Sequence, residues 1–172
     1  GASEQTSCPS GKYSGTGAME CSNCDAGTYA KSKGRSTCTL ASAGSYVDED
    51  GASNVTACPA GRYSGSGARE CEDCAVGSFS DDDGATSCAA ANSGYYVGEE
   101  GASEEDLCSA GRYSGSGASS CTKCEPGRYT DSEGQSSCLL ADAGSFVEDE
   151  GAMAAAAAEE KAKREEAEAK AA

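Results

Sequence analysis

The sequence lacks the side chains from which a large hydrophobic core is built. Among its 172 residues there is no Trp and no Ile, and Leu, Val and Phe together supply only 11 residues. A charged sequence with less than roughly 20% of such residues buries too little apolar surface to fold by burial alone. Some other interaction must therefore hold the chain together.

Histidine is also absent, and with it the commonest general acid–base side chain near neutral pH. No Ser or Cys stands in a nucleophile motif, and no glycine-rich phosphate loop precedes a helix. Transmembrane-length apolar runs and a signal-peptide segment are missing as well. We expect no enzyme activity, no cofactor and no membrane insertion, and we expect the chain to be mature or a fragment of a longer protein.

Positive charge is scarce, since 13 Lys and Arg face 29 Asp and Glu, for a net charge of −16. This balance argues against nucleic acid as a partner and against binding to anionic membrane surfaces.

Cysteine is what the chain has in quantity. The twelve cysteines lie at positions 8, 21, 24, 38, 58, 71, 74, 88, 108, 121, 124 and 138. Small domains without a core are usually cross-linked by disulfides in oxidising compartments, so we expect an extracellular, secreted or cell-surface protein. Zinc is the alternative, because Cys-x-x-Cys occurs three times. It is the weaker one: histidine is absent, and each repeat has one such pair where zinc ribbons have two.

The chain is a tandem repeat with a period of fifty residues. Gly-Ala recurs at 1–2, 51–52, 101–102 and 151–152, and the four-cysteine pattern recurs without insertion. These positions predict three cysteine-rich repeats, at 1–50, 51–100 and 101–150. The tail, 151–172, is rich in Ala, Glu and Lys with acid-first i,i+4 pairs, and we expect it to form an α-helix.

A finer period of sixteen or seventeen residues lies inside each repeat, where a Gly-x-aromatic signal recurs nine times, first at Gly11 and Tyr13. A polar turn and a second glycine follow each time, as at Gly17, which is typical of a short β-hairpin. The sequence therefore predicts a small disulfide-rich fold: an elongated, solenoid-like array of hairpins with little core, in which each unit contacts only its neighbours.

Two of every three units carry a cysteine at each end, and the third unit lacks both. Alanine stands at 41, 91 and 141, where the opening cysteine would be. Sequence alone leaves connectivity open, but paired loss indicates paired bonding. We predict bridges within units: Cys8–Cys21, Cys24–Cys38, Cys58–Cys71, Cys74–Cys88, Cys108–Cys121 and Cys124–Cys138.

The string CPAGRYSGSGARECEDCAVGSFS at 58–80 resembles the cysteine-rich repeats of ephrin-receptor ectodomains, which look like relatives of the tumour-necrosis-factor-receptor modules. The resemblance covers residues 1–150. It implies extended rods of small β-hairpins with disulfide rungs, as in receptors and large surface or matrix proteins. Two features depart from receptor modules: every third unit lacks its cysteine pair, and the repeats are unusually alike.

Two further kinds of site are suggested by local sequence. Asn54 begins an N-glycosylation sequon, Asn54-Val55-Thr56, and we expect it to carry a glycan in a secreted chain. Acidic turns such as 48–50 and 81–83 offer oxygen ligands for calcium, but they lack EF-hand spacing, so solvated charge is the simpler interpretation.

These features favour a structural repeat protein of an extracellular filament, surface appendage or matrix. We expect it to be glycosylated and to associate with copies of itself or with neighbouring repeats. The alternative is a ligand-binding or adhesion ectodomain of a cell-surface receptor. A metal-binding module is a third, weaker hypothesis.

Overall fold

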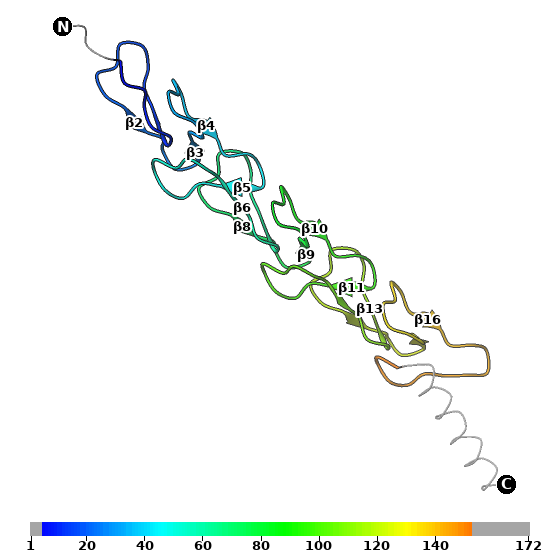
Figure 1. Cartoon of the computed structure of the whole chain (residues 1–172). Coiled ribbons are helices and arrows are strands. Elements are labelled where there is room, and N and C mark those ends of the chain that lie inside the picture. Colours follow the sequence, from blue (N-terminus) through cyan, green and yellow to red (C-terminus); the bar gives the residue numbers. More distant parts are fainter. Residues whose placement is uncertain (1–4, 153–172) are drawn as a thin grey trace, which may run out of the picture. The chain divides into compact units, whose positions relative to one another are not determined.

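The computed structural model describes residues 5–152. Within them the chain forms sixteen strands of two residues each and no helix (Figure 1). The helix expected in the tail falls on residues 153–172, which lie outside the described residues.

The strands follow one another at short intervals along the chain. They are β1 (Lys12–Tyr13), β2 (Ser22–Asn23), β3 (Thr28–Tyr29), β4 (Thr39–Leu40), β5 (Ser45–Tyr46), β6 (Thr56–Ala57), β7 (Arg62–Tyr63), β8 (Glu72–Asp73), β9 (Ser78–Phe79), β10 (Ala89–Ala90), β11 (Tyr95–Tyr96), β12 (Asp106–Leu107), β13 (Arg112–Tyr113), β14 (Thr122–Lys123), β15 (Arg128–Tyr129) and β16 (Leu139–Leu140).

Consecutive strands pair into eight antiparallel hairpins, one for each of the first eight Gly-x-aromatic signals. The ninth signal, at Gly144 and Phe146, forms no strand within the described residues. The second glycine of each unit has a positive φ, +77° at Gly51 for example, which only glycine adopts without strain. Isolated two-stranded hairpins are marginal in water. The hairpins must therefore be supported by cross-links and by one another.

We number the hairpin units 1 to 9 from their opening residues, and we call the residue after each aromatic the inner residue. The opening residues are Cys8, Cys24, Ala41, Cys58, Cys74, Ala91, Cys108, Cys124 and Ala141. The inner residues are Ser14, Ala30, Val47, Ser64, Ser80, Val97, Ser114, Thr130 and Val147.

The chain divides into two compact parts. The first consists of Gly1–Cys74, Ser80–Cys88 and Gly101–Ser103, and the second of Ala75–Phe79, Ala89–Glu100 and Glu104–Ala172. The division does not follow the fifty-residue period, because residues of 51–100 belong to both parts.

Neighbouring units in the first part are joined by backbone hydrogen bonds in a fixed pattern. Between units 3 and 4, the amide of Cys58 donates to the carbonyl of Gly44 at 2.9 Å. The amide of Gly44 in turn donates to the carbonyl of the inner residue Ser64 at 2.9 Å. The second glycine of unit 4, Gly67, donates to the carbonyl of the opening residue Ala41 at 2.8 Å. These bonds satisfy backbone groups that such short strands leave unpaired.

The second part repeats the same pattern fifty residues later. The amide of Cys108 donates to the Gly94 carbonyl at 2.9 Å, and the amide of Gly94 donates to the Ser114 carbonyl at 3.0 Å. Gly117 closes the set by donating to the Ala91 carbonyl at 2.7 Å. Each part therefore uses one junction geometry, which follows from the regular spacing of the units.

The expectation that each unit contacts only its neighbours is wrong. The first glycine of unit 3, Gly44, lies against the backbone of Gly84 in unit 5, where a Cβ atom would overlap the Gly84 carbonyl oxygen. Gly94 lies in the same way against Gly134 in the second part. The backbones approach this closely because neither glycine has a side chain.

The core consists of two side-chain positions per unit. Apart from glycines, every buried residue in 5–152 is an opening residue or an inner residue. The aromatic rings themselves are only half-buried. The buried side chains in this range are therefore Cys, Ala, Val, Ser and Thr alone, consistent with the scarcity of larger apolar residues.

Candidate functional site

Six disulfides cross-link the hairpins. They join Cys8–Cys21, Cys24–Cys38, Cys58–Cys71, Cys74–Cys88, Cys108–Cys121 and Cys124–Cys138, the pairs that paired loss predicts, and none of these cysteines is free. Each joins Cα atoms 5.7 or 5.8 Å apart and closes a loop of 13 or 14 residues. In every pair the opening cysteine is buried and its partner is half-buried.

The units without a disulfide compensate partly with a larger inner residue. Val47, Val97 and Val147 are the inner residues of units 3, 6 and 9, and they are 2–4% exposed. The other units place Ser, Ala or Thr there. This buried position was missed by sequence reasoning, although valine appears at it only where the cysteine pair is absent.

Unit 6 is also closed by a polar clamp where a disulfide would lie. The Oε2 atom of Glu105 accepts the backbone N–H of Asn92 at 2.6 Å, and its Oε1 atom accepts the Asn92 amide side chain at 2.8 Å. Asn92 follows the opening residue Ala91, and Glu105 occupies the position of a closing cysteine. Two hydrogen bonds to one carboxylate thus join the two ends of unit 6, which a disulfide joins in other units.

The buried hydroxyl groups are all paired. The Ser64 hydroxyl donates to the Ser45 carbonyl at 3.0 Å, and the Ser114 hydroxyl donates to the Tyr95 carbonyl at 2.7 Å. Among the described residues, no buried side-chain nitrogen or oxygen lacks a partner. Polar inner residues therefore carry little desolvation penalty.

The sequon residue Asn54 lies in the loop between β5 and β6 and is exposed. Its side-chain amide donates to the Ser53 hydroxyl at 3.3 Å. Nothing in the fold tests whether it carries a sugar, so glycosylation stays a prediction.

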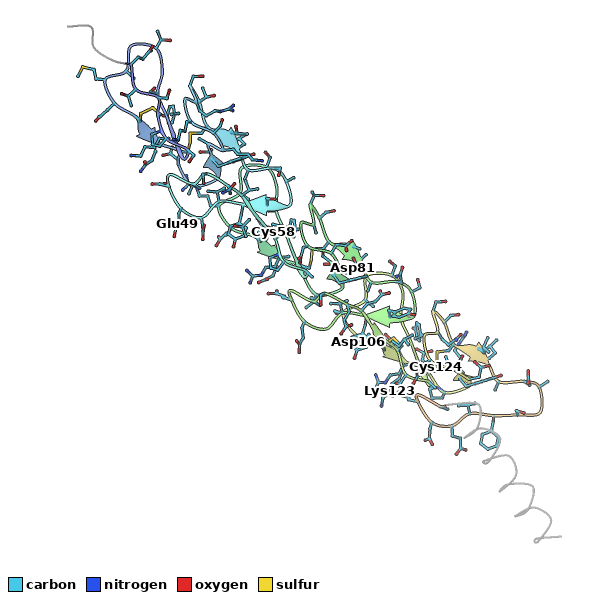
Figure 2. The ribbon with its side chains drawn as sticks, viewed as in Figure 1. Glu49, Cys58, Asp81, Asp106, Lys123 and Cys124 are labelled. Carbon is cyan, nitrogen blue, oxygen red and sulfur yellow. A yellow bond between two sulfur atoms is a disulfide. The ribbon has the colours of Figure 1, made fainter. Side chains whose placement is uncertain are left out.

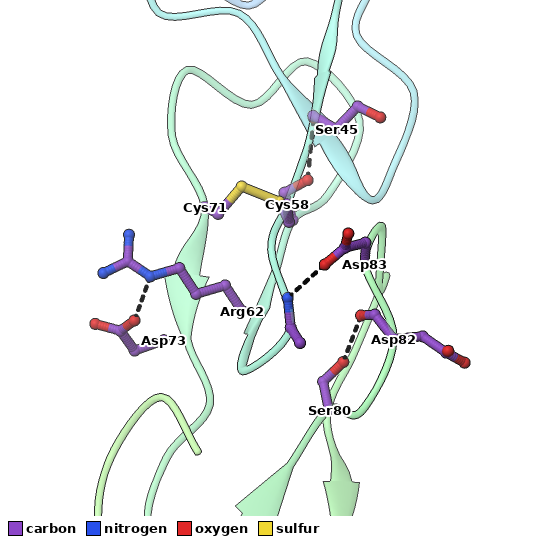
Figure 3. The surroundings of a disulfide bond; sticks show 10 residues. Ser45, Cys58, Arg62, Cys71, Asp73, Ser80, Asp82 and Asp83 are labelled. Carbon is purple, nitrogen blue, oxygen red and sulfur yellow. Dashed lines mark hydrogen bonds and ion pairs between the residues drawn. A yellow bond between two sulfur atoms is a disulfide. The ribbon is translucent and has the colours of Figure 1, made fainter. Parts of the chain in front are cut away.

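Two of the acidic turns form hydrogen bonds with the unit that precedes them. Asp50 and Asp83 each precede a second glycine. Asp50 accepts the backbone N–H of Ala26 and Asp83 accepts that of Ala60, each from the preceding unit and each at 2.9 Å. Figure 3 shows the contact made by Asp83. Residues 5–152 contain no group of three or more acidic or cysteine side chains arranged to hold a metal ion. In the same range no helix is long and apolar enough to span a bilayer.

The strands β7 and β8 form a charged face beside the Cys58–Cys71 disulfide. The Arg62 Nε atom lies 2.6 Å from the Asp73 Oδ1 atom (Figure 3). The Tyr63 hydroxyl donates to the Glu72 Oε2 atom at 2.8 Å. This hydrogen bond, more than the negative charge of Glu72, raises the pKa of Tyr63.

Replacing Glu72 with Gln should lower the pKa of Tyr63 towards its ordinary value. The hydrogen bond stabilises the folded chain fully below the ordinary tyrosine pKa, and this contribution is lost as the pH rises through the raised pKa. Ultraviolet absorbance titration of the phenols measures the change. An unchanged titration curve in the variant would contradict the assignment.

A groove of about 350 Å³ opens in the second compact part. It is lined by Tyr96, Leu107, Ser109, Arg112, Ser120 and Cys121. Sequence reasoning did not single out this place, because its residues come from two hairpin units, with Tyr96 and Leu107 on the two strands of the earlier one. The groove combines an apolar wall with one cation.

Short hairpins, disulfide rungs and a minimal core define a class of protein, the disulfide-rich repeat module. A family model described as "Tyrosine-protein kinase ephrin type A/B receptor-like" matches residues 11–58, 61–108 and 111–156. The chain belongs to this ephrin-receptor-like family. These repeats are disulfide-rich, non-catalytic modules of extracellular domains, which agrees with the extracellular compartment expected from the cysteines. No curated protein matches the chain.

Proposed function

We propose that the chain is a structural repeat protein of an extracellular filament, surface appendage or matrix, and that it associates with copies of itself. The observation that carries this proposal is the repetition of one hairpin and one set of junction hydrogen bonds at fifty-residue intervals. A ligand site is usually a local departure from such regularity, whereas a scaffold benefits from constant geometry.

The proposal includes an elongated, solenoid-like arrangement of the hairpin units. It also includes a glycan on Asn54, since this exposed loop offers space for one. The glycan would shield this exposed loop from extracellular proteases, which cut preferentially at such loops.

The alternative is a ligand-binding or adhesion ectodomain. The groove around Arg112 favours it, because a concave site with an apolar wall and a few polar groups is the usual form of a binding site.

Sedimentation velocity and electron microscopy of the oxidised full chain test the proposal. We expect concentration-dependent association into elongated assemblies at physiological salt. Discrete particles that stay monomeric at every concentration would contradict the self-associating scaffold. Small-angle scattering of the monomer tests the arrangement separately, since a compact globule would exclude an elongated array.

A further inference from the structure

Next to the groove, the third repeat has a cation at the strand position where the second repeat has an acid. Both repeats contain the same segment, GRYSGSGA, at 61–68 and 111–118. In the second repeat, Arg62 lies across the hairpin from Asp73 and pairs with it at 2.6 Å. In the third, Arg112 lies across from Lys123, which is labelled in Figure 2. The same backbone thus presents a neutralised arginine in one place and two cations in the other.

The two cations carry no ion pair within residues 5–152. Residues directly opposite in an antiparallel pair have their side chains close together, and like charges there are destabilising. The Nη1 atom of Arg112 donates to the Cys121 carbonyl at 3.0 Å, which orients the guanidinium group beside the groove. An arginine has five donors, so several remain for a carboxylate. A carboxylate bound here would relieve the repulsion between Arg112 and Lys123.

The rest of the groove is complementary to an apolar side chain next to that carboxylate. Leu107 is 48% exposed and Tyr96 is half-buried, and together they form its apolar wall. Ser109 and Ser120 stand where the second repeat has Pro59 and Glu70. The third repeat therefore lacks both the bulk of the proline and a negative charge that would repel an acidic ligand.

The chain itself carries a segment with this chemistry. Met19 is 99% exposed, the most exposed large apolar side chain among the described residues, and Glu20 follows it directly. The equivalent pairs in the later repeats are Arg69-Glu70 and Ser119-Ser120. Only the first repeat thus offers an apolar side chain beside a carboxylate at this turn.

We propose that the Met19-Glu20 turn of one copy binds in the groove of a second copy. The Glu20 carboxylate lies between Arg112 and Lys123, and Met19 packs against Tyr96 and Leu107. Contact between two different surfaces of identical chains is heterologous, and such a contact generates an open assembly when it does not close into a ring. This inference rests on the proposed self-association and names the contact that would produce it.

Two variants test the contact by sedimentation velocity at physiological salt. Glu20→Arg places a cation against the groove, and Arg112→Glu with Lys123→Glu reverses the groove itself. We expect each variant alone to associate at least about tenfold more weakly than the wild type. An equimolar mixture should recover association, because the unchanged Glu20 of one variant meets the unchanged groove of the other. Met19→Ser should weaken association without altering any charge.

Glu70→Arg is the matched control, since it makes the same charge change at the equivalent turn of the second repeat and should leave association unchanged. The mass of the oxidised chain and its amide spectrum show that each variant keeps six disulfides and its fold. Wild-type association that is insensitive to Glu20→Arg and to the groove variant would overturn this contact and leave the proposed scaffold standing. A wild type that never associates would overturn both.

Discussion

Replacing Gly44 with alanine should destabilise the chain by about 2–5 kcal/mol. A left-handed φ, +82° here, costs an L-residue about 1–2 kcal/mol. The new Cβ atom would overlap the Gly84 carbonyl oxygen, and overpacking against a fixed backbone costs about 1–3 kcal/mol more. Because unit 3 has no disulfide of its own, no cross-link holds it closed against this displacement. The midpoint of denaturant unfolding under non-reducing conditions measures the loss.

Two other glycines separate the two contributions. Gly17 has a φ of +76° but no neighbouring atom within 4 Å of a built Cβ, so Gly17→Ala should lose only the conformational part. Gly65 has neither a positive φ nor a neighbour, and Gly65→Ala should be neutral or slightly stabilising. Equal losses at Gly44 and Gly17 would show that the approach of Gly44 to Gly84 contributes nothing.

A seventh disulfide between residues 91 and 105 should stabilise the chain by about 3 kcal/mol relative to its matched control. Ala91→Cys with Glu105→Cys restores the cysteine pair that unit 6 lacks, with the 14-residue separation of Cys74–Cys88. Closing a loop of this length removes about that much chain entropy from the unfolded state. An intact mass lower by the two hydrogens of the new bond establishes the cross-link, and denaturant unfolding measures its effect.

The control carries Ala91→Ser and Glu105→Ser. It loses the same hydrogen bonds between Glu105 and Asn92 but forms no covalent bond, so the difference between the two variants isolates the cross-link. A pair of thiols that fails to oxidise in the folded chain would show that the ends of unit 6 are not placed like those of the disulfide-linked units.

The hairpins and their cross-links could be predicted because their signals are local and repeat nine times. A glycine two residues before each aromatic and a second glycine in the turn, such as Gly61 and Gly67, are enough to define each hairpin. The shared loss of both cysteines in every third unit indicated how the remaining ones pair. These inferences need no knowledge of which units meet in space.

The groove and the polar clamp were not predictable in the same way. Arg62 and Arg112 have identical flanking residues, and only the opposite strand distinguishes a neutralised arginine from one that faces Lys123. In the sequence, Glu105 is one of many acidic residues. Only the fold shows that this acid, at the position of the missing closing cysteine, binds Asn92, next to the opening residue of unit 6. The chemistry of these sites depends on pairing across strands.

The sequence by itself determined the repeat, the hairpins and the reliance on sulfur, because each arises from contacts within about fifteen residues. The tertiary structure decided which residues form the core and which glycines must remain glycine. Ala41 and Val47 are buried, and Gly44 meets Gly84, through contacts between different units. Such contacts depend on how successive turns bring segments that are distant in the sequence together. A local pattern of residues does not specify which of these segments meet.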